Sequence, residues 1–234
     1  MSKFFKGDIT NNVVELNLLD PAAVSNTPTI VTKNTGANVV EQIVGDISSN
    51  AFYFDSSVEG LVIGTSCTSI GSLAFYFAGI SGDLVIPDSV TSIGDSAFGS
   101  FQNNITSLTL GESLLTIGNN SFEFMEGVSG DLIIPDSVTS IDDGAFGGCS
   151  FDGILRIENG VTSIGSSVFI STDLTALYTN TPASSWIGNN ALGSSSALVN
   201  IYTGPNATGY DATWKSDQNT SATVSTWTNY PNIP

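Results

Sequence analysis

The sequence predicts a β-rich α/β solenoid, a stack of about seven coils of 23–24 residues with one parallel sheet, flanked by non-repeat segments. Three observations lead to this fold class. A stretch of sequence returns almost unchanged, an isoleucine recurs at a nearly constant interval, and a short run of β-forming residues precedes most of these isoleucines by nine residues. A motif that returns at a fixed interval indicates one structural unit stacked on copies of itself.

The repeated stretch reads LVIPDSVTSIGDSAF at residues 84–98 and LIIPDSVTSIDDGAF at residues 132–146. Its isoleucine is followed four and five residues later by a small and then a bulky apolar residue. The seven isoleucines in this register are Ile47, Ile70, Ile93, Ile117, Ile141, Ile164 and Ile187, at intervals of 23, 23, 24, 24, 23 and 23 residues. This register defines the coils.

A β-strand is predicted at the start of most coils, nine residues before the isoleucine. The segments are 61–63, 84–86, 108–110, 132–134 and 155–157, and 177–178 follows with one extra residue of spacing. Alternation directs the first and third side chains of each segment inward and the middle one outward. A proline such as Pro87 or a glycine such as Gly111 then turns the chain.

The segment from each isoleucine to its phenylalanine is expected to be a turn followed by a short helical or 3₁₀ piece. Residues 93–98, which read IGDSAF, show the pattern. Serine, asparagine and aspartate between the glycine and the alanine suit the capping of such a piece. We expect the Ala-Phe pair to wedge into the core.

The pattern L-x-I-P-x-S-V-T-S-I-G-x-x-A-F resembles the BspA-type, or Treponema pallidum-type, leucine-rich repeat. The match is close at 84–98 and 132–146, good at 61–75, 108–122 and 155–169, and weaker at 40–52 and 177–192. The cysteine that often follows the phenylalanine in this family occurs once, at Cys149. The resemblance implies a leucine-rich-repeat stack without catalytic residues, and a role in adhesion and surface binding.

Three parts of the chain are predicted. Residues 1–39 form an N-terminal cap or anchoring segment, residues 40–193 form the repeats, and residues 194–234 form a C-terminal capping segment. The first segment either covers the open end of the stack as irregular strands or docks the protein on a larger assembly. The aromatic residues of the last segment form either a lid on the last coil or a carbohydrate-stacking site; they are Tyr210, Trp214, Trp227 and Tyr230.

The charge of the chain excludes two classes of partner. With 5 Lys+Arg against 22 Asp+Glu, the net charge is -17, which repels nucleic acid and anionic membrane surfaces. No run approaches 18 apolar residues, so membrane insertion is not expected. No signal peptide is visible at the start, yet an extracellular or virion-surface location is expected, the second reached by another route.

Catalytic chemistry is poorly supplied, and the chain is expected not to be an enzyme. It has no histidine, so Ser/His/Asp and Cys/His arrangements and histidine metal sites are excluded. Its two cysteines, Cys67 and Cys149, lie more than three repeats apart, too far for a disulfide or a zinc site within one stack. The acids Asp83 and Asp131 recur with the repeat, which indicates turn chemistry rather than a carboxylate pair.

No cofactor is expected, and calcium is the one candidate weighed. Asp88, Glu112 and Asp136 occupy equivalent corners after the predicted strands, where stacked carboxylates repel one another unless a cation lies between them. Thr65 and Asn159 interrupt this row at its two ends. Solvated turn residues are therefore the default interpretation, and no metal ligand is assigned.

The outward side chains of the strands are the predicted binding face, expected to be concave. Its aliphatic members make an apolar stripe edged by carboxylates, and such patches often mark interaction sites. The binding residues are Val62, Asp83, Val85, Thr109, Asp131, Ile133, Arg156 and Tyr178. The alternative is that this face is tolerated surface or is covered by a neighbouring subunit.

Two functions remain open from the sequence. The first is a non-catalytic extracellular recognition or adhesion module that binds a protein or glycan through the repeat face. The alternative is a virion structural protein, such as a tail-fibre, spike or capsid-decoration component, which uses residues 1–39 for self-assembly or for contact with virion neighbours and serves host attachment.

Overall fold

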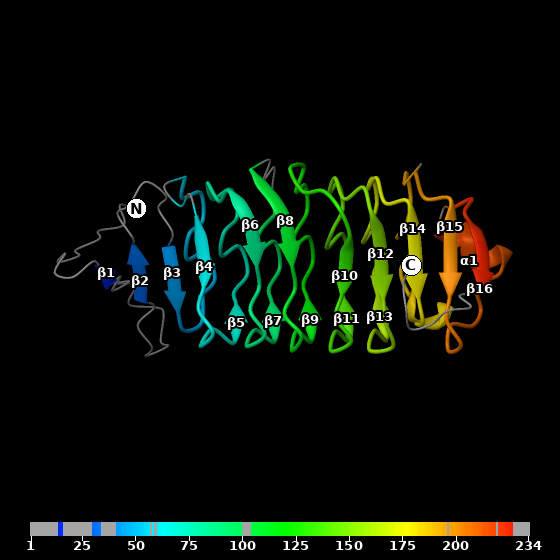
Figure 1. Cartoon of the computed structure of the whole chain (residues 1–234), viewed down its shortest axis with the longest axis horizontal. Coiled ribbons are helices and arrows are strands. Elements are labelled where there is room, and N and C mark those ends of the chain that lie inside the picture. The colour runs from blue at the N-terminus through cyan, green and yellow to red at the C-terminus, as the bar shows by residue number, and fades with distance from the viewer. Residues whose placement is uncertain are drawn as a thin grey trace.

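The structure is a computed structural model that describes residues 14–15, 30–33, 41–56, 58, 60–99, 104–195, 197–218 and 220–226, with side chains from residue 45 onward. Its strands lie side by side along the long axis of the molecule, from β1 at one end to β16 at the other (Figure 1). The chain is a parallel β-solenoid, as the sequence predicts.

The longer strands make up one face of the solenoid. They are β1 (Val14–Glu15), β2 (Ile30–Lys33), β3 (Glu41–Val44), β4 (Leu61–Ile63), β6 (Gly82–Val85), β8 (Ile105–Thr109), β10 (Leu132–Ile134), β12 (Ile154–Ile157), β14 (Ala176–Thr179), β15 (Asn200–Thr203) and β16 (Thr223–Thr226). Hydrogen bonds join them into three groups, β1 to β4, β6 with β8, and β10 to β16. From β3 onward every pairing is parallel, whereas β1–β2 and β2–β3 are antiparallel.

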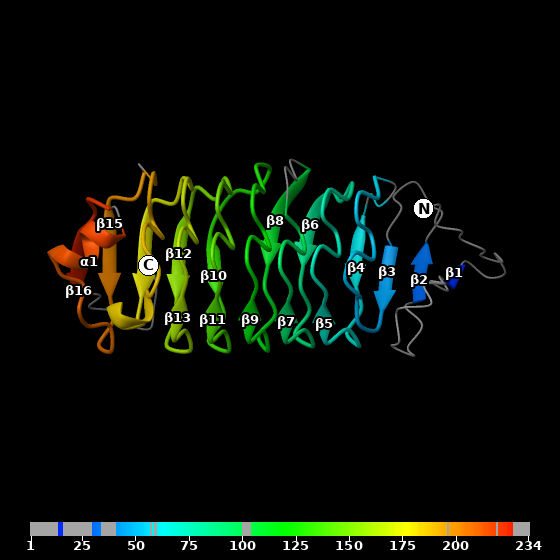
Figure 2. The ribbon, with the colours of Figure 1, turned by 180° about the vertical axis from the view of Figure 1, so that it is seen from behind.

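A second parallel sheet contains the isoleucine register. Its strands are β5 (Ser69–Ile70), β7 (Ser92–Ile93), β9 (Thr116–Ile117), β11 (Ser140–Ile141) and β13 (Ser163–Ile164). They form a separate row, visible from both sides of the molecule (Figure 2). Single bridges extend this row to Ile47 at one end and to Trp186 at the other. The isoleucines recur every 23 or 24 residues because each coil contributes one strand to this sheet.

A ladder of phenylalanine rings fills the core behind the sheets. Its members are Phe52, Phe75, Phe98, Phe122, Phe146 and Phe169, all buried. Successive rings stack with centroids 5.0, 5.0, 5.5, 5.2 and 5.7 Å apart and with planes within 9° of parallel. Each ring adds a large apolar area to a core that runs unbroken from coil to coil.

Turns replace the short helical pieces expected between the isoleucine and the phenylalanine. In each coil, the residue three positions after the isoleucine has a left-handed backbone. In most coils, among the described residues, the residue two positions after the phenylalanine has one as well. In the coil of Ile70 these are Leu73 (φ 59°) and Phe77 (φ 54°). Because a positive φ breaks a right-handed helix, the chain reverses direction here instead of winding. The helices in the described part of the chain are η1 (Ala183–Ser185) and α1 (Ala212–Asp217).

Polar side chains two residues after the isoleucines join neighbouring coils. The Asp95 carboxylate accepts hydrogen bonds from the backbone N–H and side-chain amide of Asn119, at 2.9 and 3.1 Å. In a later coil the Asp143 carboxylate accepts one from the backbone N–H of Ser166, at 2.7 Å. The turns therefore use their acids to pair backbone groups that a short coil leaves without a partner.

The seventh coil departs from the predicted register. Ile187 continues the isoleucine register in the sequence, but it is 70% exposed, while the neighbouring Trp186 is buried and bridges to Ile164. The indole extends the phenylalanine ladder, with its ring centroid 6.2 Å from that of Phe169. A larger, flat side chain thus ends the stack of rings where the repeat stops.

Aromatic residues cover this end of the core. Trp214, on α1, packs edge-on against Trp186 with ring centroids 5.5 Å apart, and the Trp186 Nε1–H donates to the Tyr210 hydroxyl at 3.0 Å. The side chain of Gln218 makes hydrogen bonds that another coil would otherwise supply. It accepts one from the N–H of Ala191 and donates one to the carbonyl of Gly188. Tyr210 and Trp214 form a lid; Trp227 and Tyr230 lie outside the described residues, as do most of residues 1–39.

Candidate functional site

The candidate site is the row of side chains at the middle positions of the long strands, called the outward row below. Backbone alternation directs these side chains away from the core, and the parallel register aligns them across the sheet. Val85 pairs with Thr109, and farther along Ile133 pairs with Arg156, which pairs with Tyr178. The fold therefore lines up residues that lie 22 to 24 positions apart in the sequence.

The structure places all eight residues assigned to the binding face on the surface. Val62, Asp83, Val85, Thr109, Asp131 and Ile133 are exposed, and Arg156 and Tyr178 are half-buried. Ile133, Arg156 and Tyr178 stand on adjacent hydrogen-bonded strands, as do Val85 and Thr109. Val62 belongs to the first group of strands, on β4, so the row spans three hydrogen-bonded groups that follow one another along the molecule (Figure 1).

The two predicted acids of the face also have structural partners. The Asp83 carboxylate accepts hydrogen bonds from the hydroxyls of Ser107 at 2.7 Å and Thr106 at 3.0 Å, which hold the pKa of Asp83 below its usual value. The Asp131 carboxylate accepts one from the backbone N–H of Ile154 at 2.8 Å. Both carboxylates join neighbouring coils, in agreement with the turn chemistry predicted for them, while their exposed sides edge the row.

Arg156 brings the one positive charge of the row. Its Nε–H donates to the carboxylate of Glu158, which is largely buried and directly follows the last residue of β12. Because the carboxylate sits below the surface, it orients the guanidinium over the sheet rather than letting it extend freely into water.

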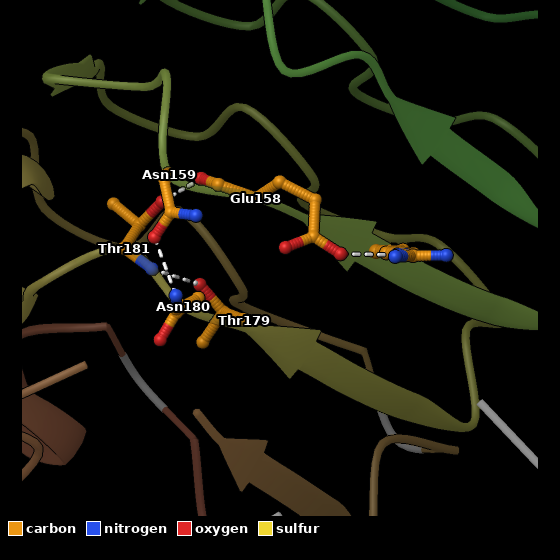
Figure 3. Close-up of polar contacts among 6 residues, drawn as sticks. Glu158, Asn159, Thr179, Asn180 and Thr181 are labelled. Carbon is orange, nitrogen blue, oxygen red and sulfur yellow. Dashed lines mark hydrogen bonds and ion pairs between the residues drawn. The ribbon is translucent and has the colours of Figure 1, made fainter. Parts of the chain in front are cut away.

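A network of amides and hydroxyls fixes the corner that follows β12 and β14 (Figure 3). The Thr181 hydroxyl donates to the Glu158 carbonyl, and the Asn180 side chain donates to the Asn159 side chain. Asn206, one coil on, donates from its side chain to Asn159 and from its backbone to Asn180. Three successive coils are thereby locked together directly beside Arg156 and Tyr178, which gives that half of the row a rigid base.

Sequence reasoning missed one member of the row, Tyr202. It stands on β15 beside Tyr178, and the two rings stack with centroids 4.6 Å apart. From the sequence, this part of the chain belongs to the C-terminal capping segment, and the alternation rule applied to residues 200–203 would have directed Tyr202 outward. The row therefore contains an Arg-Tyr-Tyr series on three adjacent strands, followed by Ser225 on β16.

One of the corner acids weighed for calcium, Asp88, bonds to the backbone of the next coil. The Asp88 carboxylate accepts a hydrogen bond from the backbone N–H of Glu112 at 2.9 Å. Among the residues the structure describes, no group of three or more His, Cys, Asp or Glu side chains is placed to hold a metal ion. The expectation that the protein uses no cofactor stays a prediction.

The two cysteines are free, buried thiols in the core. Burial raises the pKa of Cys67 to about 11 and that of Cys149 to about 12. Both stay protonated at neutral pH, so neither supplies a thiolate nucleophile. In the described part of the chain no helix is long and apolar enough to cross a membrane.

Comparisons with known proteins identify the repeat family. The family model described as BspA type leucine rich repeat region matches residues 45–130 and 123–216, in six copies. A search of curated proteins finds no match.

Two solved structures are similar to the chain. One is a leucine-rich repeat protein from Bacteroides ovatus, with a TM-score of 0.49 and 23% identity over 68% of this chain and 47% of that one. The other is a leucine rich cell surface protein from Faecalibacterium prausnitzii, with a TM-score of 0.42 and 16% identity over 80% of this chain and 72% of that one. This chain thus spans about half the length of the Bacteroides protein.

Proposed function

The chain belongs to the BspA-type leucine-rich repeat family, and on that premise we propose that it is a non-catalytic recognition module which binds a protein through the outward row. The observation that carries this proposal is the contrast within each strand. The inward positions repeat the same aliphatic chemistry from coil to coil, whereas the outward positions change from valine to threonine, isoleucine, arginine and tyrosine. A position that varies on a constant frame can be fitted to a partner.

The composition of the row suits a protein partner. Interface hot spots are rich in tyrosine and arginine, and here Arg156, Tyr178 and Tyr202 stand together on adjacent strands. Ile133 adds an exposed apolar side chain directly beside them. The corner network of Asn159, Asn180 and Asn206 holds these strands in place, which lowers the entropic cost of binding.

An extracellular, adhesive role is the finer form of the same proposal. The charge of -17 and the Ser, Thr, Asn and Gly-rich surface suit a protein exposed on a surface. A glycan is the other ligand class considered, since tyrosine rings can stack on sugars. The virion alternative depends on residues 1–39 as an anchor, and neither the described residues nor the comparisons favour it.

The test is binding of the labelled chain to arrays of purified extracellular proteins and of glycans. We expect binding to members of the protein array, weakened about tenfold or more by Tyr178→Ala or Ile133→Asp because each removes a central contact. Circular dichroism and thermal unfolding of both variants should match the original chain, since both side chains lie outside the core.

The matched control is Leu115→Ser, which removes an exposed leucine that directly precedes β9 and is not part of the outward row. It should leave binding unchanged. Equal binding by all variants would show that the outward row is not the interface. Binding to the glycan array alone would reassign the ligand class.

A further inference from the structure

Four aromatic residues, three of them exposed and one half-buried, form a second cluster at the surface, on the turns of the first two described coils. They are Tyr53, Phe54, Tyr76 and Phe77, called the turn aromatic cluster below. They follow the buried ladder residues Phe52 and Phe75 by one and two positions, and so belong to the turns and not to the strands that carry the outward row. The sequence shows them as a triplet FYF that occurs twice.

The rings of the cluster pack on one another in a regular way. Tyr53 stacks on Tyr76 with ring centroids 5.6 Å apart, and Phe54 stacks on Phe77 with ring centroids 4.8 Å apart. Within each coil the two rings meet edge to face, at 4.7 and 4.8 Å. The four side chains thus form one continuous aromatic surface across two coils.

The backbone at two of these residues is in a conformation that disfavours them. Phe54 has φ 56° and Phe77 has φ 54°, in the left-handed region. Bulky residues are rarely found there, since Cβ crowds the backbone. Later coils place Gly148, Ser171 and Ser194 at the same position, which are small residues. A phenylalanine at this position costs free energy that those coils avoid.

Both rings keep part of their surface in water. Phe54 is 58% exposed and Phe77 is 37% exposed. Phe124 has the same left-handed backbone and a similar exposure of 36%, and its ring lies over Gly148, where a Cβ would come within 2.5 Å of the ring. Residues with strained backbone are found preferentially at functional sites.

The electrostatic setting of the cluster selects the ligand. Residues 34–155 contain no Lys or Arg, whereas acids occur throughout that range, and Asp55 directly follows Phe54. Such a surface attracts positive charge. The faces of tyrosine and phenylalanine rings that another ring does not cover bind ammonium and guanidinium groups through the negative potential above the ring.

We propose that the turn aromatic cluster binds lysine and arginine side chains of a basic segment on a protein partner. The acidic coils draw such a segment to the surface, and the rings Tyr53, Phe54, Tyr76 and Phe77 then contact its cationic groups. This site is separate from the outward row, and its test does not require that the outward row bind anything.

The experiment is calorimetric titration of the full chain with a synthetic peptide of six Arg-Gly repeats at low ionic strength, and with six Lys-Gly and six Glu-Gly repeats in parallel. Both basic peptides should bind and the acidic one should not. In the double variant Phe54→Gly/Phe77→Gly, affinity for the Arg peptide should fall about tenfold, since two ring contacts are lost.

The variant is designed to keep the fold and the charge. Glycine suits the left-handed positions, so thermal stability should be unchanged or higher. The net charge stays at -17, so an attraction caused by charge alone is unaffected. A second double variant, Tyr53→Ser/Tyr76→Ser, should weaken binding in the same direction without touching the left-handed residues.

Ile187→Ser is the matched control, since it removes an exposed apolar side chain from the far end of the stack and should bind as the original chain does. Unchanged affinity in both double variants would overturn the proposal, because it would assign the attraction to net charge. Failure of the original chain to bind either basic peptide would also overturn it, as would binding of an uncharged glycan panel in place of the peptides.

Discussion

The inward phenylalanine ladder and the outward row run along the same coils and follow opposite rules. The ladder uses one residue type six times, with rings stacked 5.0 to 5.7 Å apart. In the outward row, by contrast, Val85 pairs with Thr109 and Ile133 with Arg156. Repetition within this molecule marks what holds the stack together, and variation marks what is free to meet a partner.

The ladder should therefore respond most strongly to truncation. Phe122→Ala removes a fully buried ring between Phe98 and Phe146, and should lower the free energy of unfolding by about 3–5 kcal/mol. Urea unfolding followed by circular dichroism measures this loss. A loss below about 1 kcal/mol would mean that the stacked rings are not the core of the solenoid.

Close approach of neighbouring coils should give the next largest effect. A Cβ on Gly160 would lie 1.8 Å from the carbonyl oxygen of Asp136, in the preceding coil. Gly160→Ala should therefore cost about 1–3 kcal/mol, since the coils must separate to admit a methyl group. Gly130→Ala, where φ is 83° but the space is open, should cost less. A larger loss of stability for Gly130→Ala than for Gly160→Ala would contradict the close approach of neighbouring coils at Gly160.

The aromatic lid should make the protein less stable at high pH. Burial raises the pKa of Tyr210 to about 12, above the value near 10 expected in the unfolded chain. The raised pKa means that the folded state favours the neutral phenol. The contribution of Tyr210 to the free energy of unfolding is therefore complete below about pH 10 and is lost as the pH rises toward 12. Urea midpoints measured from pH 9 to 12 should fall, and should fall less in Tyr210→Phe. Ionisation of Tyr210 near pH 10 in an absorbance titration would contradict this burial.

The bonds between coils made by the turn acids should be worth less. Asp95→Ala removes the acceptor for two Asn119 donors and should cost about 1 kcal/mol. Asp95→Asn keeps an oxygen at that place and should cost about half as much or less. Equal losses in the two variants would indicate that charge, and not the acceptor atom, is what matters.

The sequence predicted most of the fold because each coil repeats the same physical problem. The spacing of Ile70, Ile93 and Ile117 defined the coils, and alternation directed Val85 and Ile133 outward, but only one sheet was predicted and the second, at the isoleucines, was not. The short helical pieces predicted after the isoleucines were wrong. Leu73 and Phe77 have a left-handed backbone there, which no propensity rule assigns to leucine or phenylalanine. Pairing across coils was also not visible, so the stacking of Tyr178 on Tyr202 emerged only from the register of β14 and β15.

The seventh coil shows a further limit of pattern reading. Ile187 fits the interval of 23 residues, but Trp186 takes the inward position because a large indole covers the end of the ladder better than an isoleucine would. Where a repeat ends, packing against the cap outweighs the period.

The most direct test of the contrast between the two sides compares two neighbouring residues of β10. Ile133 faces outward and Ile134 is buried. Ile133→Thr and Ile134→Thr introduce the same β-branched side chain, so strand propensity is matched. We expect the free energy of unfolding to change by about 0.5 kcal/mol or less for Ile133→Thr, and to fall by about 2–4 kcal/mol for Ile134→Thr. Equal losses for the two variants would show that the outward row is part of the structural core and is not free for recognition.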